Sequence, residues 1–250
     1  MKFHKVGKVD DITVDALLYG EIKLAQRKKG YRFSLDAILL ADFVHTKPAD
    51  RIIELGSGCG VIPLWLSRRR EFKSILGVEI QPELARLARQ NVSLNGEEGR
   101  IQILEEDLRE LTQKMEKGSY DIVICNPPYR KAASGRLNPD RERAIARHEI
   151  CCTLEDVVRV TSHLLHLQGR FFTICLAERY AELLKELPRW RMSPVRVRFV
   201  HPLPEEKASH FLLEARIGSS KGFVVLPPLF VYQQEGEYTD KMLQIFQGRT

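Results

Sequence analysis

The feature that most constrains the fold of this 250-residue chain is a regular alternation of short β-rich runs with helical patterns. The runs are rich in Ile, Val and Leu, and the segments between them carry apolar residues at helical spacing. Parallel strands need a crossover connection, which is usually a helix. The alternation therefore predicts a parallel sheet with helices on both faces. The first five candidate strands are Arg51–Leu55, Ile75–Glu79, Ile101–Leu104, Asp121–Cys125 and Arg170–Cys175, and the helices are Val61–Arg69, Pro82–Asn95, Leu154–Leu167 and Ala177–Leu187.

Two further candidate strands, Val195–Val200 and Phe211–Ile217, follow closely on one another. Their short spacing predicts a hairpin at one edge of the sheet. The fold class is thus α/β, a doubly wound Rossmann-like seven-stranded sheet, mostly parallel with a C-terminal antiparallel hairpin. We expect residues 1–30 to form a small N-terminal extension and residues 31–250 to form the domain, whose tail from residue 227 packs as a short strand and helix.

Before the first strand, Ser34–His45 reads as an amphipathic helix, with Ser34 as its N-cap. Its apolar positions are Leu35, Ile38, Leu39 and Ala41. We expect this helix to cover a ligand bound at the carboxyl ends of the strands, where open α/β sheets bind their ligands.

Composition narrows the class of protein. No stretch reaches the roughly 18 apolar residues of a membrane span, and the charged N-terminus does not resemble a secretory signal, so we expect a cytoplasmic protein. The five cysteines and seven histidines show no metal-ligand spacing, and we expect neither a metal site nor a disulfide framework. The net charge of +6 weakly favours a polyanionic partner.

A glycine-rich turn, Glu54-Leu55-Gly56-Ser57-Gly58-Cys59-Gly60, lies where the first strand should become a helix. Alternate glycines let the backbone approach a ligand closely. The spacing is not that of the dinucleotide fingerprint, because position 61 is valine, and the Glu54 carboxylate would repel a pyrophosphate. A ligand with an ammonium, a sulfonium and a nucleoside but no phosphate fits better, which is the description of S-adenosylmethionine.

Two more acids lie near the next two strands, Glu79 at the end of the second strand and Asp107 after the third. Glu79 can accept hydrogen bonds from two ribose hydroxyls. Asp107 is placed to meet an adenine amino group, and it could equally be the N-cap of a short helix.

The four residues Asn126-Pro127-Pro128-Tyr129 directly follow the fourth strand and suit a planar amino group. Each residue before a proline is held out of the α region, so the backbone is stiff and rich in carbonyl acceptors. Asn126 adds a side-chain carbonyl, and Tyr129 can stack on a flat base. Alone, the motif could simply end a buried strand, because proline stops sheet pairing. Its position downstream of the glycine turn favours the amino site.

The glycine turn, Glu79, Asp107 and the Asn126–Tyr129 motif, in this order, resemble the class I S-adenosylmethionine-dependent methyltransferases that modify planar amino groups. The segment Gly30–Leu40, Arg147-His148-Glu149 and Gly236-Glu237-Tyr238-Thr239 are similar to the tRNA1(Val) adenine N6-methyltransferase-like family. The resemblance implies that the Arg32–Asp36 loop helps to close over the cofactor and that Arg147 lies near nucleic acid. The cofactor-binding residues are then Arg32, Asp36, Glu54, Gly56, Gly58, Gly60, Glu79, Ile80, Asp107, Leu108 and Asn126, and the catalytic residues are Asn126, Pro127, Pro128 and Tyr129.

A basic segment follows the amino site and indicates an RNA substrate, with tRNA as the expected RNA. A protein glutamine, rRNA or DNA amine is the nearest alternative, because an amide NH₂ is as planar as that of adenine. A non-catalytic RNA-binding module and an NAD-dependent oxidoreductase are the alternatives from other classes, and Glu54 disfavours the second. The candidate nucleic-acid contacts are Arg130, Lys131, Arg136, Arg141, Arg143 and Arg147.

Overall fold

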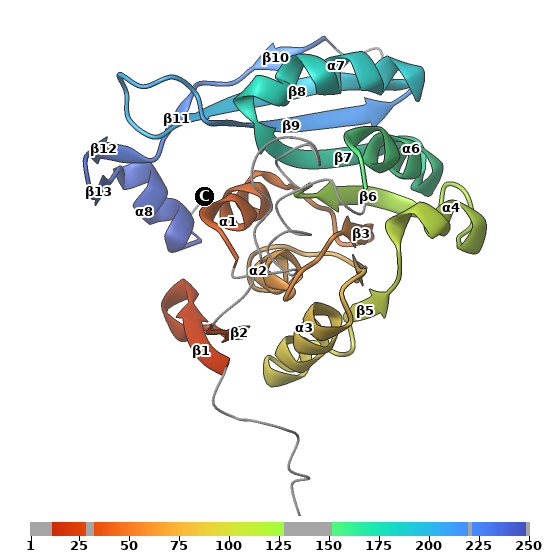
Figure 1. Ribbon diagram of the computed structural model, residues 1–250, viewed down its shortest axis with the longest axis horizontal. Helices are drawn as coiled ribbons and strands as arrows, with labels where there is room; N and C mark the ends of the chain where they lie inside the picture. Colours follow the sequence, from red (N-terminus) through yellow and green to blue (C-terminus); the bar gives the residue numbers. More distant parts are fainter. Residues whose placement is uncertain (1–11, 29–32, 128–151, 220–221, 249–250) are drawn as a thin grey trace, which may run out of the picture.

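The computed structural model describes residues 12–28, 33–127, 152–219 and 222–248. A central sheet of nine strands runs through the molecule in the order β10-β8-β9-β7-β6-β3-β4-β5, with β11 also paired to β8 (Figure 1). The strands are β3 (Arg51–Leu55), β4 (Ser74–Glu79), β5 (Ile101–Glu105), β6 (Tyr120–Cys125), β7 (Leu165–Leu176), β8 (Met192–His201), β9 (His210–Ile217), β10 (Val224–Val225) and β11 (Leu229–Phe230).

The seven predicted strands are all present as β3 to β9, and the prediction of a mostly parallel sheet with a terminal hairpin is confirmed. β3, β4, β5, β6 and β7 pair in parallel, whereas β9 is antiparallel to both β7 and β8. The sheet is wider than predicted because two short strands, β10 and β11, add in parallel to the outer edge of β8. Strands of two residues carry no readable periodicity, so the sequence did not reveal them.

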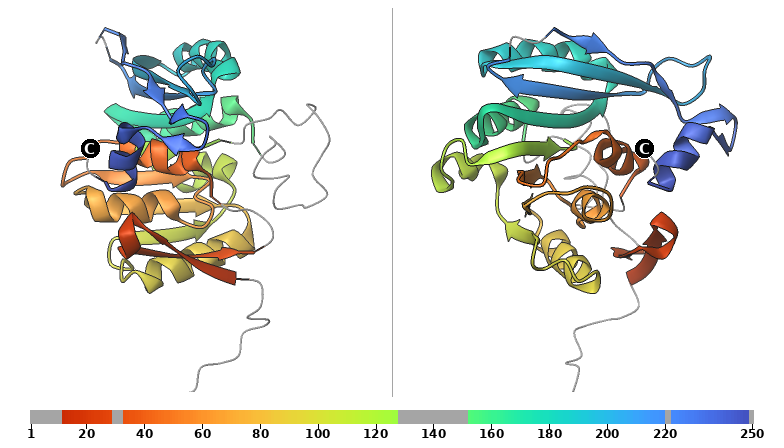
Figure 2. Two further views of the ribbon diagram at one scale, coloured as in Figure 1. Left: turned by 90° about the vertical axis from the view of Figure 1, so that its left-hand side faces the viewer. Right: turned by 180° about the vertical axis from the view of Figure 1, so that it is seen from behind.

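Helices cover both faces of the sheet (Figures 1 and 2). One apolar core lies under α1, α2, α3 and α8, and the other lies under α4, α6 and α7. The helices are α1 (Leu35–Phe43), α2 (Val61–Arg69), α3 (Pro82–Leu94), α4 (Leu111–Lys114), α6 (Leu154–Leu164), α7 (Tyr180–Arg189) and α8 (Asp240–Phe246), with 3₁₀ turns η2 (Leu18–Gly20), η3 (Leu108–Glu110) and η4 (Ala177–Arg179).

Helix α1 differs from the prediction of an amphipathic helix. Six of its nine residues are buried, because it packs between α2 and α8 as well as over the sheet. Ser34 does occupy the N-cap, but its hydroxyl donates to the Asp36 carboxylate (2.7 Å) and makes no capping bond to a backbone N–H.

Helix α6 ends at Leu164, three residues before the predicted end, because β7 begins at Leu165. Leu165, Phe171 and Phe172 are buried in the strand, and an apolar run of this kind is compatible with either element. Thr153 begins α6 with a capping box, in which its hydroxyl accepts from Asp156 N–H (3.1 Å) and the Asp156 carboxylate accepts from Thr153 N–H (3.0 Å).

Two small elements flank this core. The N-terminal extension contains an antiparallel hairpin of β1 (Ile12–Leu17) and β2 (Ile22–Arg27), which the sequence did not predict. Strand β2 packs against α2 and α3. The C-terminal tail forms a strand and a helix as predicted, with a second hairpin of β12 (Tyr232–Gln234) and β13 (Glu237–Tyr238) before α8.

Candidate active site

The glycine turn connects β3 to α2 at the carboxyl end of the sheet. Gly56, Gly58 and Gly60 have φ angles of 76°, 56° and 84°, a region that side-chain-bearing residues rarely adopt. Backbone N–H groups of Gly56 and Ser57 both donate to the carbonyl of Val78 in β4 (2.8 and 2.9 Å). The turn is therefore fixed to the neighbouring strand before any ligand binds.

Glu54 is the last acid of β3 and faces a pocket beside this turn. The residue is 2% exposed, and its Oε2 has no hydrogen-bond partner among the described residues. Burial, together with the nearby Glu79 carboxylate, raises the pKa of Glu54 well above its ordinary value. A buried carboxylate oxygen without a donor is costly, and a cationic ligand group would relieve that cost.

The pocket is partly open and has a volume of about 20 Å³, which suits a small charged group such as an ammonium. Asn126 lies on its wall, so the structure brings together three groups that the sequence singled out: the strand-end acid, the glycine turn and the start of the amino site. The described residues that line the pocket are Phe33, Ala37, Glu54, Gly56, Ser57, Cys59, Val61, Ile62 and Asn126.

Glu79 ends β4 and is held by backbone donors. Its Oε2 accepts from Gly58 N–H (2.8 Å), and its Oε1 accepts from Gln81 N–H (2.9 Å). Burial raises the pKa of Glu79, while these backbone bonds and one from Ile80 oppose the rise. The carboxylate thus connects the glycine turn to the start of α3, a role that the sequence prediction of a ribose contact did not include.

This geometry agrees with known proteins. The family model of the methyltransferase small domain matches residues 34–142. Residues 34–142 are therefore similar to a methyltransferase small domain. A Porphyromonas gingivalis protein named tRNA1(Val) (adenine(37)-N6)-methyltransferase is 29% identical over 211 residues, which are 82% of each chain. A Parabacteroides distasonis protein of the same name is 28% identical over 75% of this chain and 77% of its own.

Among solved structures, a predicted O-methyltransferase from Agrobacterium tumefaciens superposes with a TM-score of 0.69 at 24% identity, covering 86% of this chain and 97% of its own. This likeness supports the fold alone. The match and the named relatives confirm the resemblance to the methyltransferases that the sequence indicated.

Two acids that the sequence predicted as cofactor contacts lie at neighbouring strand ends. Asp107 is the N-cap of η3, where Oδ1 accepts from Arg109 N–H (2.9 Å), and the Arg109 guanidinium also pairs with the carboxylate. The N-cap alternative is therefore present in the fold, and contact with adenine stays a prediction. Ile80 and Leu108, which follow the acids Glu79 and Asp107, are half-buried.

Asp36 lies in the first turn of α1 but is not among the residues that line the pocket. Its Oδ1 is 3.9 Å from His210 Nε2 at the start of β9. The neighbours Phe33 and Ala37 form part of the wall instead. The sequence predicts that the loop before α1 covers the cofactor. Which of its residues face the pocket depends on tertiary packing, so the sequence alone did not distinguish Phe33 and Ala37 from Asp36.

Pro127 is buried directly after Asn126. The remaining predicted site residues lie outside the described residues: Arg32, Pro128, Tyr129, Arg130, Lys131, Arg136, Arg141, Arg143 and Arg147. Within the described ranges there is no cluster of His, Cys, Asp and Glu side chains that could hold a metal ion. No helix in the same ranges is long and apolar enough to cross a membrane.

Proposed function

We propose that this chain transfers a methyl group from S-adenosylmethionine to the exocyclic amino group of an adenine in tRNA. The observation that carries the proposal is that Glu54 and Asn126 line one pocket beside the glycine turn. The relatives named as tRNA1(Val) (adenine(37)-N6)-methyltransferases support the choice of adenine and of tRNA. Residues 31–250 would form the catalytic domain, and a tRNA substrate fits a cytoplasmic location.

The residues at the pocket fit S-adenosylmethionine. When bound, the cofactor supplies an electrophilic methyl group on a positively charged sulfur. The Glu54 carboxylate, buried and lacking a donor at Oε2 among the described residues, would accept from the cofactor ammonium. Glu79 has acceptor capacity beyond its backbone bonds, since each carboxylate oxygen has two lone pairs, and would hold the ribose hydroxyls. Both acids make the site unfavourable for a pyrophosphate.

Asn126 and Pro127 would orient the substrate amine. An adenine amino group is a poor nucleophile, because its lone pair is delocalised into the ring. The Asn126 side-chain oxygen and the Pro127 carbonyl would accept its two N–H bonds and so favour a tetrahedral nitrogen. The same acceptors would stabilise the positive charge that develops on the nitrogen before a proton is lost, so that no strong general base is needed. Tyr129 would stack on the base.

The test is transfer of labelled methyl from S-adenosylmethionine to bulk tRNA, rRNA, DNA and protein, followed by nucleoside analysis. We expect label in tRNA as N6-methyladenosine. Label found in protein glutamine instead would overturn the RNA substrate while leaving the cofactor and the amino site in place. Absence of transfer to all four, with a folded protein that does not bind S-adenosylmethionine, would overturn the proposal as a whole.

A further inference from the structure

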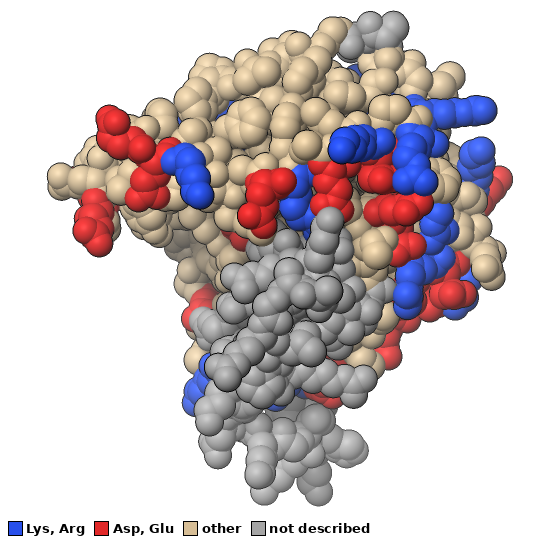
Figure 3. Space-filling model, turned by 45° about the horizontal axis from the view of Figure 1, so that its top comes forward, with Lys and Arg blue, Asp and Glu red and all other residues tan. Residues whose placement is uncertain are grey.

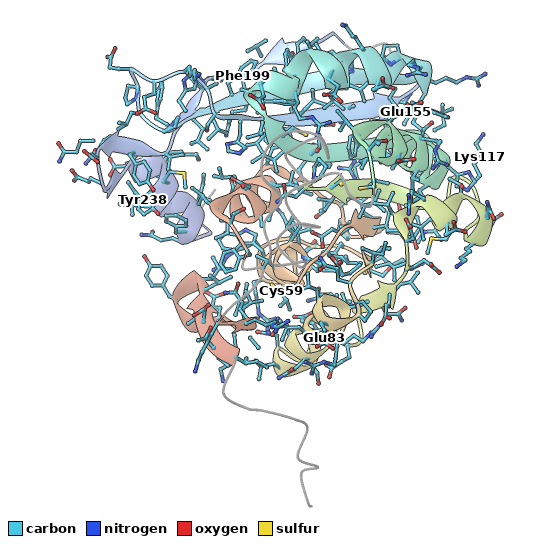
Figure 4. All side chains as sticks on the ribbon, in the orientation of Figure 1. Cys59, Glu83, Lys117, Glu155, Phe199 and Tyr238 are labelled. Atoms are coloured by element: carbon cyan, nitrogen blue, oxygen red, sulfur yellow. The ribbon has the colours of Figure 1, made fainter. Side chains whose placement is uncertain are left out.

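Asn91 of α3 joins the N-terminal hairpin to the glycine turn. Its side chain is fully buried, and its Nδ2 donates both protons, one to the carbonyl of Ala25 in β2 (3.0 Å) and one to the carbonyl of Cys59 (2.9 Å). Its Oδ1 accepts from Ala25 N–H (2.7 Å). Because Cys59 lies in the glycine turn and lines the pocket, one amide connects β2 to a wall of the cofactor site. Figure 4 labels Cys59 at the start of α2, beside the hairpin and α3.

Gln26 joins the same hairpin to a second part of the wall. It is 1% exposed, and its Oε1 accepts from Phe33 N–H (3.1 Å), while its Nε2 donates to Asp15 Oδ2 in β1 (2.5 Å). Phe33 lines the pocket just before α1. Both strands of the hairpin therefore contribute to holding Phe33.

Helix α3 supports the glycine turn with two residues of one face. A Cβ atom added at Gly60 would lie 3.5 Å from the Cβ of Ala88, so the backbone of the turn already packs closely on α3. Asn91 follows Ala88 by three residues and so lies on the same face of the helix. Loss of the Asn91 amide would leave the buried Cys59 carbonyl without this donor, at the point where the turn must keep its shape.

Asn95, one helical turn further along, provides an internal comparison. Its Oδ1 accepts from Lys23 N–H (2.9 Å), and its Nδ2 donates to the Lys23 carbonyl (2.7 Å). Asn91 and Asn95 thus bind alternate residues of β2 through the same pair of backbone groups. The Asn95 amide bonds to the hairpin and to α3 itself, whereas the Asn91 amide also bonds to the glycine turn.

We propose that the hairpin β1–β2 is a structural part of the cofactor site, and that Asn91 and Gln26 are positioning residues that set cofactor affinity through Cys59 and Phe33. The inference rests on the proposed function, because it takes the ligand of the pocket to be S-adenosylmethionine. It gives the N-terminal extension a role in binding the cofactor, in addition to any role in stability.

The test compares Asn91→Ala with Asn95→Ala in the full chain. Calorimetry gives the Kd for S-adenosylmethionine, and thermal unfolding gives the Tm of the ligand-free protein. We expect Asn91→Ala to raise the Kd about three- to tenfold, because it removes the hydrogen bond to the Cys59 carbonyl that connects the turn to α3 and β2. Asn95→Ala should lower the Tm while leaving the Kd within about twofold of the parent value. At saturating cofactor, kcat of Asn91→Ala should stay near the parent value, since the residue does not touch the reacting atoms.

A second variant and a second measurement keep the test decisive if Asn91→Ala does not fold. Gln26→Leu keeps a side chain at this buried position and removes the acceptor of Phe33 N–H together with the donor to Asp15, and it should also raise the Kd. In ligand-free protein, amide exchange at Gly60 should be faster in Asn91→Ala than in Asn95→Ala.

The possible failures are distinguishable. A parent chain that does not bind S-adenosylmethionine overturns the proposed function, and this inference with it. A parent that binds the cofactor, with Asn91→Ala and Gln26→Leu at the parent Kd, overturns the inference alone. Equal rises in Kd for Asn91→Ala and Asn95→Ala also overturn it, because the hairpin would then act only through general stability.

Discussion

At the scale of single residues, the site combines features that oppose stability. Glu54 and Glu79 are both buried, and the Glu79 carboxylate makes Glu54 harder to ionise. Glu79 has backbone donors, but Glu54 Oε2 has none among the described residues, so a protein that only needed to fold would place an apolar side chain at position 54. The arrangement makes sense when a ligand supplies the missing positive charge, and perturbed carboxyl groups of this kind cluster at functional sites.

Glu54→Gln should therefore stabilise the ligand-free protein and weaken the cofactor complex. The raised pKa of Glu54 means that the folded state binds more protons than the unfolded state. The stability of the parent protein relative to the variant is therefore highest at low pH, and it falls as the pH rises from about 4.3, the ordinary glutamate pKa, through the raised pKa. The variant and parent should have similar Tm values at pH 4, with the variant higher at pH 8. Cofactor affinity should fall by about 1–3 kcal/mol with loss of a charge-assisted hydrogen bond.

Thermal unfolding at both pH values measures the change in Tm, and calorimetry at pH 8 measures the change in cofactor affinity. A Tm difference that is the same at pH 4 and pH 8 would show that the glutamate charge is not its cause. Unchanged cofactor affinity would remove Glu54 from the binding site.

Asn126→Ala should abolish turnover and leave cofactor affinity nearly intact. Its side-chain oxygen is expected to contact the amine chiefly in the transition state, and removal of one such polar group typically costs about 10²–10³ in kcat. Single-turnover methyl transfer and calorimetry on the same preparation separate the two effects. Retained kcat would contradict the amino-site mechanism, and a large loss of cofactor affinity would make Asn126 a cofactor ligand instead.

The residues that sequence reasoning missed share a physical cause. Asn91 and Gln26 are polar side chains in elements that face the protein interior, and a single sequence gives such residues the appearance of a solvated surface. Glu54, Gly56 and Asn126 were recognised because they lie at or directly after the ends of predicted strands, where the carboxyl ends of parallel strands meet. The sequence shows which residues lie next to a predicted strand. It does not show the contact between Ala25 and Asn91, which are 66 residues apart.

At the scale of elements, a buried ion pair joins the entry to β3 with β7. Arg170 Nη2 donates to Asp50 Oδ2 (2.5 Å), and both side chains are 7% exposed. Arg170 also donates to the carbonyl of His45 (2.8 Å), and Asp50 accepts from Lys47 N–H (2.5 Å). These bonds fix the connection between α1 and β3 relative to a strand 120 residues away, and so help to keep the amino ends of the strands in register.

Asp50→Ala should lower the free energy of unfolding by about 3–5 kcal/mol, because it leaves the buried Arg170 charge without its partner. The exposed pair Arg86–Glu83 on α3 is the matched control (Glu83 is labelled in Figure 4). Glu83→Ala should change the free energy by no more than about 0.5 kcal/mol, as is usual for surface pairs. Urea unfolding of both variants measures the difference. Equal small decreases would mean that Arg170 finds another partner.

The order of elements was predictable because apolar residues alternate or run continuously in strands, whereas in helices they recur about every 3.6 residues. Helix α2 has the predicted bounds, Val61–Arg69, since glycines precede it and the apolar run, buried through Leu66, gives way to the basic residues Arg68 and Arg69 in the last turn. The predicted end of α6 was wrong by three residues, because Leu164 and Leu165 are both buried and no turn residue separates α6 from β7. The hairpin β1–β2 was missed because β1 alternates only between half-buried and exposed positions.

At the scale of the whole molecule, positive charge is the feature that relates the fold to an RNA partner. On the face shown in Figure 3, Lys and Arg are interspersed with Asp and Glu over the described surface. Many described arginines are paired with acids, as Arg68 is with Glu97 and Arg189 with Glu186. The described Lys and Arg side chains on that face therefore do not form a patch of one sign. The sequence offers one segment in which basic residues outnumber acids six to two, residues 130–147, which lies outside the described residues.

Charge reversal of Arg136, Arg141 and Arg143 to Glu should weaken RNA binding and flatten its salt dependence, because phosphate contacts release counterions. Each arginine that no longer binds a phosphate should reduce the slope of log K against log salt by about one. A matched control reverses Lys47, Lys73 and Lys117, three exposed lysines before β3, β4 and β6, at the amino ends of the strands. Figure 4 labels Lys117 at the edge of the molecule, far from Cys59.

Both triple variants lower the net charge by the same amount, so a nonspecific effect of charge should act on them equally. Filter binding to tRNA at low and high salt gives the slopes, and the Kd for S-adenosylmethionine serves as the control for folding. We expect the arginine variant alone to show a reduced slope. If both variants show the same reduction in slope, long-range charge accounts for RNA binding. If the arginine variant methylates tRNA at the parent rate at both salt concentrations, residues 130–147 are not the RNA-binding surface. A protein glutamine then becomes the better substrate hypothesis.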